Sequence, residues 1–195
     1  VHHVGHANTD FVAGWYGSSV TSDYFAESNG VDHNYTFFHS HGCDCANFPS
    51  SSVMEKLVTI STFAVATIGN SRYGWFNEGQ TEGPSCHLHR EMTDAFWADR
   101  IPYLGLALTD SKCQTAPFVN APGQWEEGAL RWNFYDLNIM GDVAVKPWHD
   151  EPFRADVHYD KAFVQGTTST KVRVSHRGEN LANYRCSIYK DDIML

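Results

Sequence analysis

The chain lacks long apolar runs, an excess of positive charge and a secretion signal. No apolar stretch approaches the roughly 20 residues that a transmembrane helix needs, so we expect no membrane span. Lysine and arginine number 14 against 23 aspartate and glutamate residues, and the net charge of -9 argues against nucleic-acid binding. An initiator methionine is also missing, and Val1 already lies in a strand-like run. We therefore expect the N-terminus to be a cut end, so the missing signal says nothing about export.

The number of cysteines is odd. The five cysteines are Cys43, Cys45, Cys86, Cys113 and Cys186. At least one thiol must therefore lie outside any disulfide within the chain. Cys43 and Cys45 are too close in an extended segment to bond to each other, whereas a bridge between Cys86 and Cys113 stays open.

The sequence does contain enough hydrophobic material for a core, since 42% of its 195 residues are hydrophobic and 14% are aromatic. Residues 1–4, 35–38 and 63–68 form short apolar runs that are typical of buried strands. Between them, Ser52 with Glu55 three residues later indicates the start of a helix. Strand and helix patterns alternate up to about residue 150, which predicts an α/β fold with a parallel sheet.

Helical patterns follow the third apolar run. Four apolar residues have the spacing of one face of a helix, and they predict a helix that Ser85 caps. This apolar stripe consists of Leu88, Met92, Ala95 and Phe96. Residues 128–137 predict a further helix, and residues 103–108 fit either a helix or a strand. The polar segment 9–34 is expected to hold a short helix among loops.

Beyond residue 150 the pattern changes. Residues 170–175 alternate apolar and polar side chains, and residues 186–190 do so less cleanly. Both segments predict half-buried antiparallel strands. We therefore assign residues 1–150 to the α/β domain and residues 151–195 to a β module, which is too short for a complete β-sandwich.

Two of the strand-like runs end in a reactive residue. The first continues into His6 and Ala7, and the second continues into Cys43. Because the carboxyl ends of parallel strands meet at one edge of a sheet, we expect His6 and Cys43 to lie together there. A histidine base beside a cysteine is the arrangement of a thiol nucleophile, and the backbone N–H groups of Ala7 and Cys43 would face a substrate oxygen.

The same segment supports a second interpretation. His39, His41, Cys43 and Cys45 alternate, so an extended strand would place all four on one face as ligands for zinc or copper. Residues 86–89, with the sequence Cys-His-Leu-His, form a second group of the same kind. The plainer alternative is that the two histidines are hydrogen-bonded polar residues near a strand end. The spacing of the residues alone leaves the nucleophile, the metal site and the structural role open.

Several motifs resemble one family. Ser40-His41-Gly42-Cys43 followed by Phe48 resembles the nucleophile segment of the gingipain-like cysteine peptidases, which belong to a caspase-like clan. Gly5-His6-Ala7-Asn8 is similar to their catalytic histidine motif. Further stretches match in order, at residues 68–75, 83–91, 110–112 and 131–142. Together the matches cover about residues 1–148. Each motif alone resembles the family only modestly, but the whole set in this order is specific to it.

The resemblance implies the C-terminal part of a caspase-like catalytic domain, followed by the start of an immunoglobulin-like β domain. It implies Cys43 as nucleophile, His6 as general base or acid, and Trp75 as a wall of the primary specificity pocket. It further implies a protein or peptide substrate, a secreted or cell-surface location and no cofactor for catalysis, and it allows a structural calcium ion.

The chain also departs from the family pattern. Ala7 stands where the family has glycine, which narrows the oxyanion site, and Asp142-Val143 replaces a common Asp-Pro pair. The family's upstream half is not in this sequence. That half carries the first strands, an acidic residue that orients the histidine, and the pocket residues that select the substrate. We therefore expect an upstream chain or segment to complete the catalytic domain.

These inferences together predict a cysteine endopeptidase that works by acyl transfer. Cys43 attacks the peptide carbonyl, His6 protonates the leaving amine, and water releases the acyl-enzyme. The alternative is a non-catalytic metal-binding or adhesion module that derives from such a peptidase.

Overall fold

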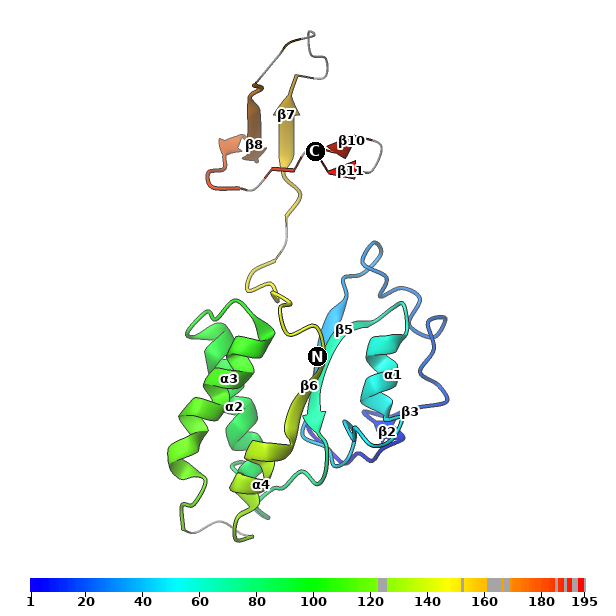
Figure 1. The fold of residues 1–195 in the computed structure, drawn as a ribbon, viewed down its shortest axis with the longest axis vertical. Helices are drawn as coiled ribbons and strands as arrows, with labels where there is room; N and C mark the ends of the chain where they lie inside the picture. Colours follow the sequence, from blue (N-terminus) through cyan, green and yellow to red (C-terminus); the bar gives the residue numbers. More distant parts are fainter. Residues whose placement is uncertain are drawn as a thin grey trace. The chain divides into compact units, whose positions relative to one another are not determined.

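The computed structural model describes residues 1–122, 126–151, 153–160, 166, 169–184, 186–187, 189–190 and 193–194. Contacts within the chain divide it into two units, Val1–His149 and Asp150–Leu195 (Figure 1). The expected site residues all belong to the first unit.

The first unit is built on a four-stranded sheet with the order β1-β4-β5-β6. The strands are β1 (His2–His3), β4 (Thr36–Ser40), β5 (Ala64–Asn70) and β6 (Leu137–Gly141). The first three run parallel, as the sequence predicts, whereas β6 runs antiparallel to β5. The expectation of a purely parallel sheet is therefore corrected to a mixed, parallel-rich one.

The direction of β6 follows from the helix before it. Helix α4 (Ala129–Asp136) passes directly into β6 without a crossover, and Leu137 pairs with Asn70 at the carboxyl end of β5. The Ser71 N–H donates to the Asp136 carbonyl oxygen over 2.9 Å, which fixes this junction. A strand that starts at the carboxyl end of its neighbour runs back along it, and this gives the antiparallel pairing.

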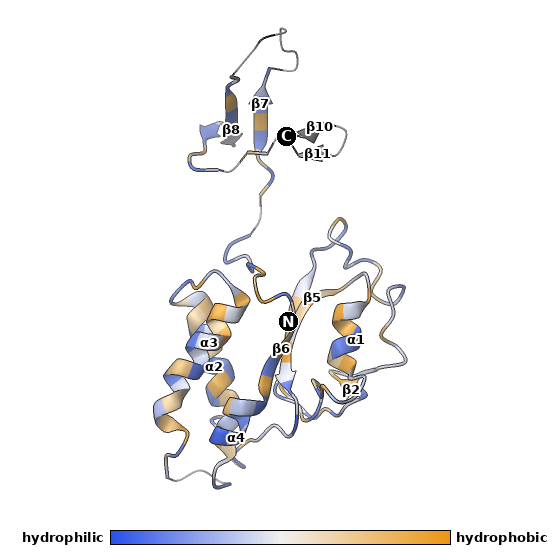
Figure 2. Cartoon of the chain, in the orientation of Figure 1, coloured by the Kyte–Doolittle hydropathy of each residue, from blue (hydrophilic) through white to orange (hydrophobic). Residues whose placement is uncertain are grey.

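Helices cover both faces of the sheet (Figure 1). Helix α1 (Val53–Thr59) lies on one face, and α2 (Pro84–Trp97), α3 (Leu104–Thr115) and α4 lie on the other. Two buried clusters result, one around Phe38, Met54 and Leu57 and one around Ile68, Leu88 and Met92. Figure 2 shows hydrophobic residues on helices at both faces. The α/β layer arrangement predicted from the sequence is confirmed.

The helix starts follow the sequence signals in one case and not in the other. Ser52 caps α1, and its side chain accepts from the Glu55 N–H over 3.4 Å, as predicted. Helix α2 is capped by Gly83 and has Pro84 in its first turn, so the expectation that Ser85 caps it is wrong. Proline fits the first turn because it has no N–H to satisfy, and the predicted stripe on α2 is buried.

Two remaining expectations for this unit are settled by the structure. Residues 103–108 belong to helix α3 rather than to a strand. The short helix expected in segment 9–34 is wrong, because Phe11–Val12 (β2) and Trp15–Tyr16 (β3) form an antiparallel hairpin. Both residues between these strands have positive φ, 52° at Ala13 and 88° at Gly14, which suits a two-residue hairpin turn. The 3₁₀ helix η1 (Ala116–Phe118) ends α3.

The second unit contains short antiparallel strands. Strands β7 (Asp156–Tyr159), β8 (Val172–His176) and β9 (Glu179–Asn180) form one sheet, and β10 (Tyr189–Lys190) pairs with β11 (Ile193–Met194). The strand predicted at residues 170–175 corresponds to β8. Ile188, in the second predicted strand, lies outside the described residues. An immunoglobulin-like sandwich stays a prediction. In the described part of the chain, every helix is too short or too polar to cross a membrane.

Candidate active site

The expected active site lies at the edge where β1 and β4 end. The two strands are parallel neighbours, with His2 opposite His39 and His3 opposite Ser40. The loops that follow them touch, since a methyl group on Gly42 would lie 2.2 Å from the Ala7 Cβ and 3.1 Å from the Ala7 nitrogen. The fold therefore brings the histidine and cysteine motifs together.

The two motifs meet through their backbones rather than through their reactive groups. His6 is exposed. Within the described residues, no hydrogen bond joins its ring to the sulfur of Cys43. The catalytic pairing of these two residues thus stays a prediction.

The thiol of Cys43 is half-buried at the end of this loop. Its sulfur lies 3.6 Å from the Gly74 carbonyl oxygen, to which the S–H donates. Burial raises the pKa of Cys43, and the nearby carboxylates of Asp44 and Asp136 raise it further. The resting group is therefore a neutral thiol, and it needs a base or a cationic partner to become a nucleophile.

The neighbouring thiol of Cys45 differs in kind. Cys45 is fully buried in the cluster beneath α1, and its S–H donates to the Gly42 carbonyl oxygen over 3.4 Å. Burial raises its pKa to about 11. Cys43 is therefore the more accessible and the more easily ionised of the two thiols, and Cys45 acts as a small core residue.

The turn that carries Cys43 is held by the end of β5. The Asn70 side-chain amide donates to the carbonyl oxygens of His41, over 2.9 Å, and Gly42, over 3.2 Å. The Asp44 N–H donates to the Arg72 carbonyl oxygen over 2.5 Å, and Asp44 has a φ of 52°. Sequence reasoning did not select Asn70, although a polar residue at the end of an apolar strand was a signal for it.

Two backbone donors in the adjoining His6 and Cys43 loops have no backbone or side-chain acceptor. In the described part of the chain, neither the N–H of Ala7 nor that of Cys43 donates to a protein acceptor. The intervening Gly42 N–H is used internally, because it donates to the Ser40 Oγ over 2.9 Å. The two free donors are those that the sequence predicted for an oxyanion.

Trp75 lies on the loop that contacts Cys43. It directly follows Gly74, and its backbone exchanges hydrogen bonds with Ser85: the Trp75 N–H donates to Oγ, and the Ser85 N–H donates to the Trp75 carbonyl, both over 3.0 Å. The indole is half-buried, and its Nε1 atom is buried without a hydrogen-bond partner. Its role as a pocket wall stays a prediction.

A buried carboxyl group that sequence reasoning missed supports the same loop. Asp136 accepts from the Arg72 N–H over 3.2 Å and from the Asn133 side-chain amide over 3.3 Å. The Asn133 amide also donates to the Tyr73 carbonyl oxygen over 3.2 Å. Burial raises the pKa of Asp136 to about 7. The sequence gives no sign of this, since a carboxylate at a helix end is ordinarily exposed.

Asp136 should make the stability of the chain depend on pH. Its pKa is about 7 in the folded chain against a reference of 3.8, so the folded chain holds the proton more tightly. The contribution of Asp136 to stability should therefore be greatest below about pH 4 and fall by on the order of 3 kcal/mol as the pH rises to 7. The buried histidines, whose pKa values are lowered, act in the opposite direction, so the contribution of Asp136 is the difference between the wild type and a variant without this carboxyl group. Asp136→Asn cannot ionise and should remove most of that fall. Urea midpoints from pH 4 to 8 measure it, with the exposed Asp99→Asn as control. Equal pH profiles for the wild type and Asp136→Asn would contradict the assignment.

The predicted row of metal ligands does not form. His39 and His41 point to the α2 face, where the His39 Nδ1 lies 3.2 Å from the His89 Nδ1. The sulfurs of Cys43 and Cys45 bond to the carbonyls described above. The reason is that β4 ends at Ser40, so strand alternation does not continue to the cysteines. The open question of a disulfide is also settled, since all five cysteines are free.

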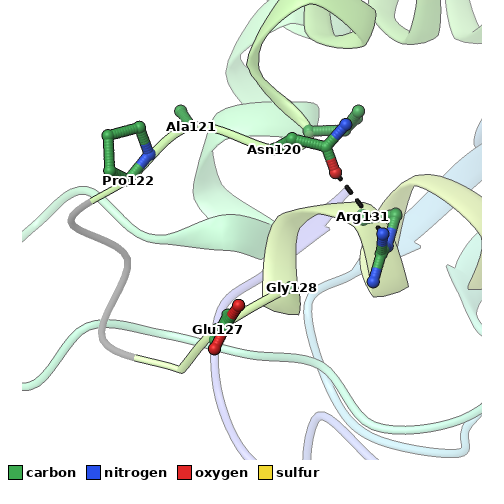
Figure 3. Close-up of a pocket in the computed structure, with 7 residues that line it drawn as sticks. Asn120, Ala121, Pro122, Glu127, Gly128 and Arg131 are labelled. Carbon is green, nitrogen blue, oxygen red and sulfur yellow. Dashed lines mark hydrogen bonds between the residues drawn. The ribbon is translucent and has the colours of Figure 1, made fainter.

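A surface pocket lies elsewhere in the unit, between η1 and the start of α4 (Figure 3). The Arg131 guanidinium donates to the Asn120 side-chain oxygen over 3.4 Å at its wall, and Glu127 lies nearby. It shares no lining residue with the Cys43 loop.

Comparison with known proteins points to one family. The family model described as peptidase family C25 matches residues 1–148. Among solved structures, the Arg-specific cysteine proteinase gingipain R matches with a TM-score of 0.61 at 13% identity, covering 90% of this chain and 39% of that one. A structure described as a protease matches with a TM-score of 0.53 at 14% identity, covering 99% and 44%. The chain thus spans about two fifths of the length of these structures. No curated protein matches it.

Proposed function

The chain belongs to peptidase family C25, and on this premise we propose that it carries the nucleophile and the histidine of a cysteine endopeptidase. The observation that carries the proposal is the contact between Gly42 and Ala7, which joins the two loops that hold Cys43 and His6. Of the two thiols in this loop, Cys43 is half-buried and Cys45 is buried. Acyl transfer requires a nucleophile and a base close to each other, and the loops after two adjacent parallel strands can supply both.

The proposed reaction starts with the removal of the Cys43 proton by the His6 imidazole. The thiolate attacks the carbonyl carbon of the substrate peptide bond, and the carbonyl oxygen becomes an oxyanion. The free N–H groups of Ala7 and Cys43 stabilise that oxyanion, and the imidazolium returns its proton to the leaving amine. Water then hydrolyses the thioester, which frees Cys43 and the second product.

The resting structure fits a site that becomes active only when it is fully assembled. Burial and the nearby carboxylates raise the pKa of Cys43, so the thiol needs the positive charge of a protonated His6 next to it. His6 is exposed, and no hydrogen bond or ion pair holds its ring among the described residues, so it needs an orienting group. We propose that an upstream segment supplies this group and part of the substrate pocket, and that the protein acts outside the cell or at its surface.

A covalent affinity label tests the assignment. Peptidyl chloromethyl ketones with different residues next to the ketone should alkylate Cys43: its sulfur bonds to the methylene carbon and chloride leaves. We expect peptide mapping of the labelled protein, with its upstream segment present, to place the label on Cys43 and not on Cys113, which is exposed on α3. Equal labelling of both thiols, or faster labelling of Cys113, would refute the proposal.

A further inference from the structure

We propose that His2, His41 and His89 form a binding site for a transition-metal ion, for which Zn²⁺ is the test ion, on the α2 face of the sheet. One ring nitrogen from each of these histidines lies within 4.8 Å of the others. In the described part of the chain, this is the one group of three or more potential ligands that converges in this way. The site uses neither Cys43 nor His6, so it goes beyond the proposed peptidase chemistry.

The fold gathers these rings from three separate elements. In β4, alternation directs His39 to the face opposite Phe38, and His41 follows two residues later just past the strand. His2 in β1 pairs with His39 in register, and their rings stack with centroids 4.0 Å apart. His89 on α2 reaches the same place, and its ring stacks on His41 at 4.0 Å.

The distances between the ligand atoms suit one ion. The Nε2 atoms of His2 and His41 lie 2.7 Å apart. A tetrahedral zinc ion with Zn–N bonds of about 2.05 Å would hold two nitrogens about 3.3 Å apart. This nitrogen–nitrogen distance lies between the 2.7 Å that separates His2 from His41 and the 4.8 Å within which all three ligand atoms lie. Small rotations of the rings would therefore admit the ion.

An unsatisfied buried atom indicates that the cluster is incomplete without a ligand. His89 is 1% exposed, and its Nε2 has no hydrogen-bond partner. A buried polar atom without a partner is costly, and most such atoms in native proteins are satisfied. Because the Nδ1 of His89 pairs with His39 over 3.2 Å, Nε2 is the nitrogen left to bind a metal.

Hydrogen bonds to neighbouring side chains orient two of the three rings, those of His41 and His89, as metal ligands. An Nδ1–H donated by His89 to His39, and one donated by His41 to the Cys86 sulfur 3.6 Å away, would leave the Nε2 atoms of His89 and His41 unprotonated. The His41 Nε2 then accepts from the His2 Nε2 over 2.7 Å, a hydrogen bond that a bound metal ion would replace. Such outer partners commonly orient ligand histidines.

The donor set selects the class of metal. Three imidazoles without a carboxylate suit zinc, copper or nickel rather than calcium or magnesium. His2 is exposed, which gives the ion a route into the site. Three protein ligands leave the fourth tetrahedral position for water or another ligand.

Metal titration of the full chain tests the proposal. The metal-stripped chain should bind one Zn²⁺, and Co²⁺ should give the visible absorption of a four-coordinate nitrogen site. His2→Gln, at the exposed position, should weaken Zn²⁺ binding by about 100-fold, because one of three ligands is lost. His89→Gln should do the same. His33→Gln is the control, because His33 is an exposed histidine that pairs with Glu27.

The outcomes separate this proposal from the peptidase proposal. Cys43→Ala should bind Zn²⁺ as the wild type does, because Cys43 is not a ligand. If the wild type binds no Zn²⁺, or if His2→Gln binds it with unchanged affinity, the metal site is refuted while the assignment of Cys43 stands. If Zn²⁺ binding is lost in Cys43→Ala, the ion is held at the thiol instead, and the proposal is equally refuted.

Discussion

Cys43→Ala is expected to lower the kcat/KM of the protein, with its upstream segment present, by at least about 1,000-fold, because the half-buried thiol of the loop after β4 is then gone. Stability should change little, since Cys43 is half-buried and its one hydrogen bond, to Gly74, is a long S–H contact. The measurement is peptide hydrolysis alongside urea unfolding. A large loss of activity with an unchanged unfolding midpoint assigns a chemical role to Cys43.

Two other cysteines provide the controls. Cys113→Ala should keep full activity, because this exposed thiol lies on α3 away from the loop. Cys45→Ala should cost about 1 kcal/mol of stability, because a buried sulfur and its contact with Gly42 are lost. Its activity should fall far less than that of Cys43→Ala. If Cys45→Ala were the inactive variant and Cys43→Ala the active one, the choice between the two thiols would be reversed.

The sequence could predict those parts of the site that depend on local pattern. Parallel β1 and β4 place His6 and Cys43 at one edge because strand direction alone decides it. The Ser52 cap and the stripe on α2 depend on neighbours within one helix, and both are observed. The choice of Cys43 over Cys45 relied on family resemblance, and burial now supports it independently.

The parts that sequence reasoning missed depend on contacts between distant segments. Asn70 holds the Cys43 turn through Gly42, which lies 28 residues away in the chain. Asp136 holds the loop after β5 through Arg72, which lies 64 residues away. The direction of β6 depends on where α4 meets β5. The row of four metal ligands was wrong because it assumed that β4 continues past Ser40. His2 and His89 lie near His41 in the fold but 39 and 48 residues from it in the chain. Local spacing could mark residues 86–89 as possible ligands, but it could not join His89 to His41 and His2.

Gly42→Ala is expected to disrupt the junction between the loops that hold His6 and Cys43. The added methyl would lie 2.2 Å from the Ala7 Cβ, so the loops of His6 and Cys43 must separate. Overpacking of this kind should cost about 1–3 kcal/mol, and a displacement near 1 Å at a catalytic pair should lower kcat/KM by about 100-fold. Affinity labelling of Cys43 and urea unfolding would measure the two effects.

The same clash predicts a specific rescue. Ala7→Gly removes the methyl that the new side chain meets, so Gly42→Ala with Ala7→Gly should recover most of the activity and stability lost by Gly42→Ala alone. The remaining contacts, 3.1 Å to the Ala7 nitrogen and to the Ser40 Oγ, are tight but tolerable. Gly42→Ala with Ala26→Gly is the matched control, because Ala26 is exposed in the loop before β4. Rescue by Ala7→Gly and not by Ala26→Gly would give a coupling energy between the loops. Equal rescue, or none, would show that the contact between Gly42 and Ala7 does not position the site.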